Sequence, residues 1–255
     1  MIKAVLLDLS GVLYEGGQAI DGSAAAVARL RGAGLPVRFI TNSTRDPRRV
    51  LLAKLAEMGF DIAPEELFTP ARAAVETLTR DGVTPHLLVH PDLEEDFADL
   101  PQDGRPGAVV VGDAAQHFTY DAMNAAFRAL HGGAALIALA ANRSFKDSDG
   151  ELSIDAGAFV AALEYAARTK AQVLGKPAPD FFAAALASMG CDAADAVMVG
   201  DDAEADIAGA LRAGLGAAVL VRTGKYQQGD ETRVDPAPSR VCADLSDAVD
   251  WILSG

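Results

Sequence analysis

Four polar clusters stand directly after short apolar runs that are typical of β-strands. They are Asp8, the triplet Thr41-Asn42-Ser43, Lys176, and the pair Asp201-Asp202 with Asp206 close behind. Together they offer a nucleophilic carboxylate, hydroxyl and amide donors, a cation and further carboxylates. Phosphoryl transfer needs this assortment, because the transferred group must be held, neutralised and attacked at the same time.

The acidic residues divide into a nucleophile and ligands for a metal ion. An ionised Asp8 can attack phosphorus and form a covalent acyl-phosphate. Because this carboxylate and the phosphate repel each other, a cation must lie between them, and hard carboxylate oxygens favour Mg²⁺. We expect Asp8 and Asp201 to bind the ion, together with a backbone carbonyl just after Asp8. Asp202 and Asp206 are expected to orient the residues that bind it.

The remaining polar residues are predicted to hold the phosphoryl group. Lys176 would balance the charge on Asp8 and on the phosphoryl oxygens. The hydroxyl of Thr41 and the backbone N–H groups of Asn42 and Ser43 would bind the equatorial oxygens. Taken singly, each cluster could be a helix cap, a turn, a solvated lysine or a complement to a helix dipole. Their common position after strands favours a site.

The elements that would position these groups alternate between strands and helices, as in βα units on a parallel sheet. Because the carboxyl ends of parallel strands share one edge, the four clusters should converge there. The first and last thirds of the chain predict an α/β fold with a Rossmann-like, doubly wound parallel sheet. Its strands are expected at 2–8, 36–41, 171–174, 196–200 and 216–221, and its helices at 22–31 and 202–213.

The middle third of the chain has α/β signals of its own. Strands are expected at 86–90, 108–112 and 134–140, and helices near 119–131 and 156–168. Periodicity alone leaves two arrangements open. These elements could extend one long sheet, or they could form an inserted second α/β domain.

The bulk composition excludes some classes of partner. The 255 residues carry 22 basic and 36 acidic side chains, a net charge of −14. No stretch gathers Lys and Arg into the basic stripe that nucleic-acid binding needs. The two cysteines form no metal-binding pattern, which favours a reducing compartment. The apolar run at the N-terminus is too short for a signal peptide or a membrane span, so we expect a cytoplasmic protein with no membrane partner.

The polar clusters together resemble the four ordered motifs of the haloacid dehalogenase (HAD) superfamily. The matching segments are Asp8-Leu9-Ser10-Gly11-Val12-Leu13, Thr41-Asn42, Gly175-Lys176-Pro177-Ala178-Pro179, and Gly200-Asp201-Asp202 with Asp206. The resemblance implies a HAD catalytic core at 1–75 and 175–255, with a smaller α/β cap domain of the large C2 type inserted at 76–174. It favours the inserted domain over one long sheet. Closure of the cap would use hinges near 70–80 and 170–175.

The resemblance also implies roles for particular residues. Asp8 would be the nucleophile and a Mg²⁺ ligand, Ser10 would bind Mg²⁺ through its carbonyl, and Asp201 would complete the protein ligands. Substrate binding would fall to Ser10, Thr41, Asn42, Ser43 and Lys176. The segments LLDLSGVLYEGG, GKPAPDFF and VRTGKY resemble those HAD enzymes that cleave pyrophosphate and the P–N bonds of phosphohistidine and phospholysine. Small phosphorylated substrates, a phosphoprotein substrate and a homodimer are the partners that this likeness implies.

Ser10 departs from the pattern of most phosphatases in the superfamily, which carry a second Asp at that position as a general acid and base. A serine hydroxyl is a poor proton donor at neutral pH, and losing positioned acid catalysis costs roughly 10²–10⁴ in rate. Alkyl phosphates should suffer most, whereas pyrophosphate and protonated phosphoramidates leave without that help. Ser10 therefore favours pyrophosphate or P–N substrates. Two alternatives stay open: a broad small-molecule phosphomonoesterase, and a turnover-impaired phosphate-binding interaction module.

Overall fold

The computed structural model describes residues 2–101, 104–146 and 151–254. These residues form two compact units, each with its own core. The first unit comprises Met1–Thr41, Arg49–Phe68 and Lys176–Gly255, and the second comprises Asn42–Arg48 and Thr69–Gly175. In the described residues, no helix combines the length and the apolar character that crossing a bilayer requires.

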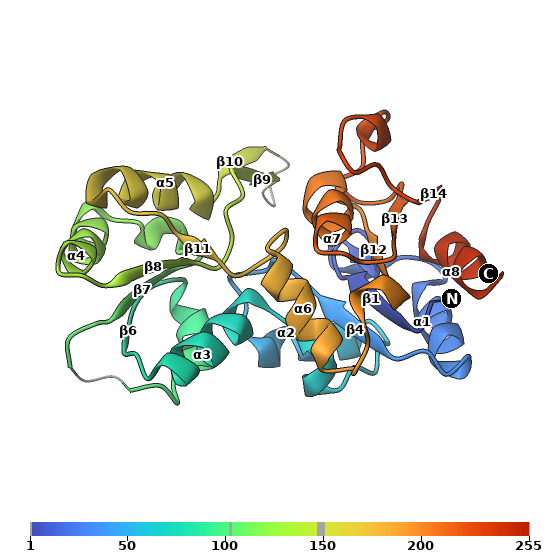
Figure 1. The fold of residues 1–255 in the computed structure, drawn as a ribbon, viewed down its shortest axis with the longest axis horizontal. Coiled ribbons are helices and arrows are strands. Elements are labelled where there is room, and N and C mark those ends of the chain that lie inside the picture. The colour runs from blue at the N-terminus through green and yellow to red at the C-terminus, as the bar shows by residue number, and fades with distance from the viewer. Residues whose placement is uncertain (1, 102–103, 147–150, 255) are drawn as a thin grey trace. The chain divides into compact units, whose positions relative to one another are not determined.

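The first unit is built on a parallel sheet with six described strands, in the order β14-β13-β12-β1-β4-β5 (Figure 1). These strands are β1 (Ala4–Asp8), β4 (Val37–Ile40), β5 (Leu67–Phe68), β12 (Ala196–Gly200), β13 (Ala217–Val221) and β14 (Arg240–Cys242). Strand β1 lies in the middle and pairs with both β12 and β4. All of its residues are buried, as expected for a strand covered on both faces.

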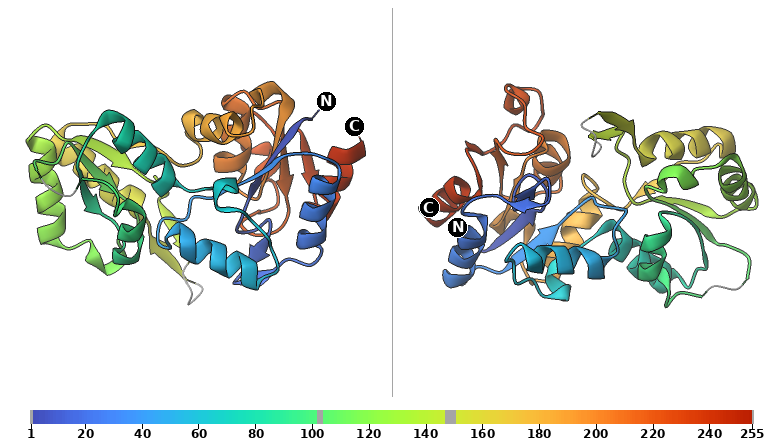
Figure 2. Two further views of the ribbon diagram at one scale, coloured as in Figure 1. Left: turned by 90° about the horizontal axis from the view of Figure 1, so that it is seen from below. Right: turned by 180° about the vertical axis from the view of Figure 1, so that it is seen from behind.

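Helices cover both faces of this sheet (Figures 1 and 2). On one face, α1 (Ser23–Gly32), α2 (Arg48–Glu57) and α8 (Leu245–Ser254) pack on alternate strand residues such as Val5 and Leu7. On the other face lie α6 (Pro179–Ala187), the π-helical turn η5 (Ala203–Ala208) and α7 (Gly209–Arg212). The smaller elements are the hairpin β2 (Tyr14–Glu15) and β3 (Gln18–Ala19), and the turns η1 (Pro64–Glu66), η4 (Ala193–Asp195) and η6 (Asp230–Thr232).

The second unit has a separate parallel sheet, whose described strands run in the order β11-β8-β7-β6. They are β6 (Pro85–Leu88), β7 (Ala108–Val111), β8 (Ala135–Ala138) and β11 (Gln172–Val173). One face packs on α3 (Pro70–Asp81) and η2 (Pro91–Phe97), and the other on α4 (Tyr120–His131) and α5 (Ala156–Ala167). The turn η3 (Ala115–His117) and the hairpin β9 (Ser144–Lys146) and β10 (Leu152–Ile154) complete it.

The predicted fold class is confirmed: the protein is a doubly wound α/β fold, and the middle third forms a sheet of its own. Three local expectations need correction. The strand expected at 171–174 in the first sheet is β11, which pairs with β8 and belongs to the sheet of the second unit. Residues 70–80, expected as a connecting segment, belong to α3, which begins at Pro70 after the N-cap Thr69. The helix expected over 202–213 starts with a π-helical turn. The C-terminal strand β14 and helix α8 were not predicted.

Candidate active site

Asp8 and Lys176 form a buried ion pair at the carboxyl end of the central strand of the first unit. Asp8 is the last residue of β1, and Lys176 precedes α6. The Lys176 Nζ lies 2.6 Å from Asp8 Oδ1 and 2.6 Å from Asp206 Oδ1. Burial alone would lower the pKa of Lys176, but Asp206 and Asp8 outweigh that effect and raise it. Lys176 therefore stays cationic between two carboxylates.

Asp206 occupies the π-helical turn that follows β12. Its side chain is fully buried, and its Oδ2 accepts a hydrogen bond from the backbone N–H of Asp202 at 3.1 Å. Gly200 makes room for it, because a Cβ at Gly200 would overlap the Asp206 side chain. Burial raises the pKa of Asp206, and the ammonium of Lys176 limits that rise. Asp206 is thus a second carboxylate that holds Lys176 in place beside Asp8. Single π-helical turns of this kind are frequent at functional sites.

Asp201 directly follows β12 and has one engaged and one open carboxylate oxygen. Its Oδ2 accepts a hydrogen bond from the backbone N–H of Lys225 at 2.7 Å. Its Oδ1 is buried and has no hydrogen-bond partner within the described residues. Burial, together with the negative charge of Asp8, raises the pKa of Asp201 to about 6. An open, buried carboxylate oxygen of this kind is costly unless a cation binds it.

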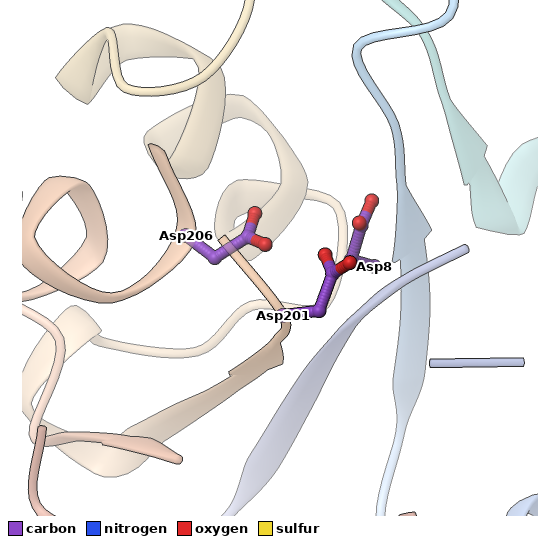
Figure 3. Close-up of side chains that lie close together, drawn as sticks. All are labelled: Asp8, Asp201 and Asp206. Atoms are coloured by element: carbon purple, nitrogen blue, oxygen red, sulfur yellow. The ribbon is translucent and has the colours of Figure 1, made fainter. Parts of the chain in front are cut away.

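Asp8, Asp201 and Asp206 together form an acidic cluster whose ligand atoms lie within 4.8 Å of one another. Figure 3 shows the carboxyl groups of Asp8 and Asp201 side by side, with Asp206 directed toward them. Carboxylate oxygens at this spacing suit a hard divalent cation. The open Oδ1 of Asp201 is the specific observation that fits the cluster to a metal ion.

The other residues predicted for the site differ in their burial and in the contacts that the structure gives them. Ser10 lies two residues after Asp8 and is exposed. Thr41 is buried and follows Ile40, the residue paired with Asp8 across the sheet. Asp202 caps η5 by accepting hydrogen bonds from two backbone N–H groups. Partial burial would raise the pKa of Asp202, but the hydrogen bond from the Ala205 N–H and the charge of Lys225 lower it.

Asn42 and Ser43 are half-buried residues of the second unit. Their expected contact with a phosphoryl group at Asp8 stays a prediction. The expected contacts of Ser10 and Thr41 with substrate also stay predictions.

The turn Thr223–Lys225 lies at the same edge of the sheet, although its residue types predicted no role for it. It follows β13 and reaches Asp201 through the Lys225 N–H group and Gly11 through the Thr223 hydroxyl. The rule that strand carboxyl ends meet at one edge could have located this turn. Its contact with Asp201 uses a backbone atom, however, which leaves no signature of residue type.

Comparisons with known proteins agree with this geometry. A family profile described as haloacid dehalogenase-like hydrolase matches residues 5–100, and a second one, described as HAD-hydrolase-like, matches residues 173–248. The human haloacid dehalogenase-like hydrolase domain-containing protein 2 is 45% identical over 252 residues, which cover 99% of this chain and 96% of that protein.

The chain belongs to the haloacid dehalogenase-like hydrolases. A second HAD relative, the phospholysine phosphohistidine inorganic pyrophosphate phosphatase of Xenopus laevis, is 45% identical over 99% of this chain and 95% of that protein. The p-nitrophenyl phosphatase of Archaeoglobus fulgidus has a similar structure, with a TM-score of 0.91 at 26% identity over 98% of this chain and 99% of that one.

A further HAD structure shows the fold with a metal ion. The glycerol phosphate phosphatase of Mycobacterium tuberculosis in complex with magnesium matches with a TM-score of 0.85 and 28% identity, over 96% of this chain and 76% of that one. The predicted family and the predicted enzyme class, a HAD phosphatase, are confirmed. The acidic cluster is therefore a candidate site for a divalent metal ion in an enzyme of this class.

Proposed function

We propose that this HAD phosphatase is Mg²⁺-dependent, works through an aspartyl-phosphate at Asp8, and acts on pyrophosphate or on P–N bonds. The observation that carries this proposal is the buried Asp8–Lys176–Asp206 set beside the open Oδ1 of Asp201. It supplies a nucleophile, a fixed cation and an open ligand atom within one small volume. A bound Mg²⁺ would be held by Asp8, the Ser10 carbonyl and Asp201, and would neutralise charge on the phosphoryl group.

The residues of the chain divide the reaction between them. The Asp8 carboxylate attacks phosphorus, the bond from phosphorus to the leaving group breaks, and its electron pair departs with that group. Water then attacks the phosphorus of the aspartyl-phosphate, which releases inorganic phosphate and restores Asp8. Lys176 would balance the charge on Asp8 and on the phosphoryl oxygens throughout both steps. Thr41, Asn42 and Ser43 would orient those oxygens.

Ser10 underlies the proposed choice of substrate. It stands where a general acid would protonate the leaving group, and its hydroxyl cannot do so efficiently at neutral pH. Pyrophosphate and a protonated phosphoramidate release stable leaving groups without an added proton. The name of the Xenopus relative, which specifies phospholysine, phosphohistidine and inorganic pyrophosphate, supports the same substrates for this chain.

The second unit is proposed to act as the cap of this enzyme. The expected bounds, a cap at 76–174 and a catalytic core at 1–75 and 175–255, differ from those of the two units, because residues 42–48 and the start of α3 belong to the second unit. A cap of this kind closes over a bound phosphate and excludes water during transfer. Cytoplasmic location, a phosphoprotein substrate and assembly into a homodimer stay part of the same proposal.

A turnover panel tests the proposal directly. Wild-type enzyme with and without Mg²⁺ would be assayed on pyrophosphate, phosphohistidine and several alkyl phosphates. We expect no turnover after chelation, recovery with Mg²⁺, and higher kcat/KM on pyrophosphate and phosphohistidine than on sugar phosphates. Asp8→Asn should be folded and inactive, and a phosphoryl group trapped on the wild type should map to Asp8. Appreciable turnover by Asp8→Asn would contradict the covalent mechanism.

A second candidate, a broad phosphomonoesterase, is favoured by the names of the two structural relatives, a p-nitrophenyl phosphatase and a glycerol phosphate phosphatase. Ser10→Asp separates the two candidates. Restoring a carboxylic acid should raise kcat/KM on alkyl phosphates more than on phosphoramidates, within the roughly 10²–10⁴ that acid catalysis supplies. Wild-type kcat/KM that is independent of the leaving-group pKa would instead favour the broad phosphomonoesterase, because another group would then deliver the proton.

A further inference from the structure

The turn formed by Thr223, Gly224 and Lys225, which we name the 223–225 turn, decides which oxygen of Asp201 stays open. The backbone N–H of Lys225 donates to Asp201 Oδ2 at 2.7 Å, whereas Oδ1 stays buried without a partner in the described residues. A backbone amide keeps its proton at every physiological pH, so Oδ2 is engaged permanently. Asp201 therefore has one oxygen, Oδ1, that is open to a cation in the cluster, while the position of its carboxylate is held through Oδ2.

The same turn holds the chain just after Ser10. Gly11 has a φ of 82°, its N–H donates to the carbonyl of Tyr14 at 2.7 Å, and its carbonyl accepts from the Thr223 hydroxyl. Because the trans peptide group is planar, the Ser10 carbonyl points away from the Gly11 N–H. Tyr14 and Thr223 thus fix both peptide groups that flank Gly11, and with them the direction of the Ser10 carbonyl.

Two glycines allow the 223–225 turn to approach Asp201 this closely. Both have positive φ angles, 82° at Gly11 and 65° at Gly224. A Cβ at either position would overlap Asp201 Oδ2, and a Cβ at Gly224 would also lie 2.6 Å from the Gly11 Cα. Glycine is required at both positions, because any side chain would displace the Asp201 carboxylate. The two glycines therefore allow the Asp201 carboxylate its position against the turn.

We propose that the 223–225 turn is the positioning element of the divalent-cation site, with Thr223 as its positioning residue. Its Lys225 N–H holds Oδ2 of Asp201 and leaves Oδ1 for the cation, and its Thr223 hydroxyl holds the Gly11 carbonyl, one peptide group after the Ser10 carbonyl that is proposed as a ligand. This inference rests on the proposed Mg²⁺-dependent function. Outer residues that orient metal ligands typically contribute roughly 10–100-fold to metal affinity.

The test measures metal binding without turnover. Mn²⁺ binding to the full-length, metal-free protein is followed by titration calorimetry in the wild type, Thr223→Val and Thr223→Ser. Valine keeps the shape of threonine and removes its hydroxyl, whereas serine keeps the hydroxyl. Thr232→Val is the matched control, because Thr232 also donates its hydroxyl to a glycine carbonyl, that of Gly229 at 2.8 Å, in the same surface segment.

We expect Thr223→Val to raise the Kd for Mn²⁺ roughly 10-fold or more, and Thr223→Ser and Thr232→Val to stay within about 2-fold of wild type. Thermal unfolding of the metal-free proteins shows whether Thr223→Val is folded. If it is not folded, Thr223→Ala takes its place, and we expect its Kd for Mn²⁺ to exceed that of Thr223→Ser by the same factor. Unchanged Kd in Thr223→Val, or an equal loss in Thr223→Ser, would overturn the inference while leaving the proposed function intact. Failure of the wild type to bind Mn²⁺ or Mg²⁺ would instead overturn both.

Discussion

Two segments of the chain have nearly the same sequence and end in aspartates of different character. Residues 108–115 read AVVVGDAA and residues 196–203 read AVMVGDDA. Each contains a fully buried parallel strand and a Gly-Asp pair at its carboxyl end, one in each unit. In the second unit, Asp113 Oδ1 accepts from the Ala115 N–H at 3.0 Å, and Oδ2 pairs with Arg45 Nε at 2.5 Å. In the first unit, Asp201 keeps one oxygen open.

The difference shows that the partners of a strand-end aspartate, rather than its position, decide its role. Both aspartates are buried to nearly the same degree, with 8% of Asp113 and 2% of Asp201 exposed. The oxygens of Asp113 are satisfied by residues of its own unit, so this carboxylate ties residues 42–48 to the end of β7. Asp201 retains the capacity to bind a cation because one of its oxygens is left without a partner in the described residues.

The largest expected effect concerns the cations that face these carboxylates. Lys176→Met removes a buried ammonium from two carboxylates, which should cost about 3–5 kcal/mol of unfolding free energy in the metal-free protein. It should also reduce turnover roughly 10²–10³-fold. Arg45→Met removes a cation whose side chain is 42% exposed and should cost about 0–1 kcal/mol. Chemical denaturation measures the free energy of unfolding of both variants. Equal losses of this free energy would contradict the contrast between the two sites.

The second effect concerns metal affinity. Asp201→Asn should raise the Kd for Mn²⁺ by at least the roughly 10–100-fold expected of residues outside the ligand set, because it removes a charged ligand. Asp113→Asn should leave this Kd unchanged and cost about 0–1 kcal/mol of stability through its weakened bond to the partly exposed Arg45. Calorimetric titration of both variants, with thermal unfolding as the check on folding, compares them directly. A loss of affinity in Asp113→Asn would erase the distinction.

The smallest effect is the response of the metal site to pH. Burial and Asp8 raise the pKa of Asp201 to about 6 in the metal-free protein, so a proton and a cation compete for the carboxylate. Above this pKa the carboxylate is ionised and the affinity should level off. Below it, affinity should fall by up to about tenfold per pH unit. Mn²⁺ titrations between about pH 5 and 8 would show this bend, and a flat profile would contradict it.

The sequence predicted the strand-end carboxylates because an apolar run that stops at an acidic residue marks the carboxyl end of a buried strand. It also predicted that Lys176 lies beside Asp8, but the reason given was wrong, because the strand that precedes Lys176, β11, belongs to the other sheet. It could not distinguish Asp113 from Asp201, because the deciding partners, Arg45 and the Lys225 N–H, are distant in the chain. The N–H group of Lys225 is a backbone donor that almost any residue type would supply, so the residue type does not reveal this contact.

The fold was predicted best where elements are buried on both faces, as in β1 and β12, whose residues are almost continuously apolar. Helix α3 was missed because residues 70–80 were expected to be a hinge beside the inserted domain, although Pro70 is of a type favoured in the first turn of a helix. The π-helical turn at Ala203–Ala208 was predicted as an ordinary helix. Within this turn, Asp206 packs closely on Gly200, which is a tertiary contact that the helical pattern of the sequence does not encode.

The central place of β1 also constrains the order in which the chain can fold during synthesis. Ala4 pairs with Ala196, so one side of β1 has no neighbour until most of the protein has left the ribosome. The sheet of the second unit is complete by Val173 and depends on much shorter separations. Long-range parallel pairing is slow to form, whereas local βα units assemble early. The second unit is therefore expected to fold first. The acidic cluster is expected to assemble later, when the newly synthesised β12 pairs with β1.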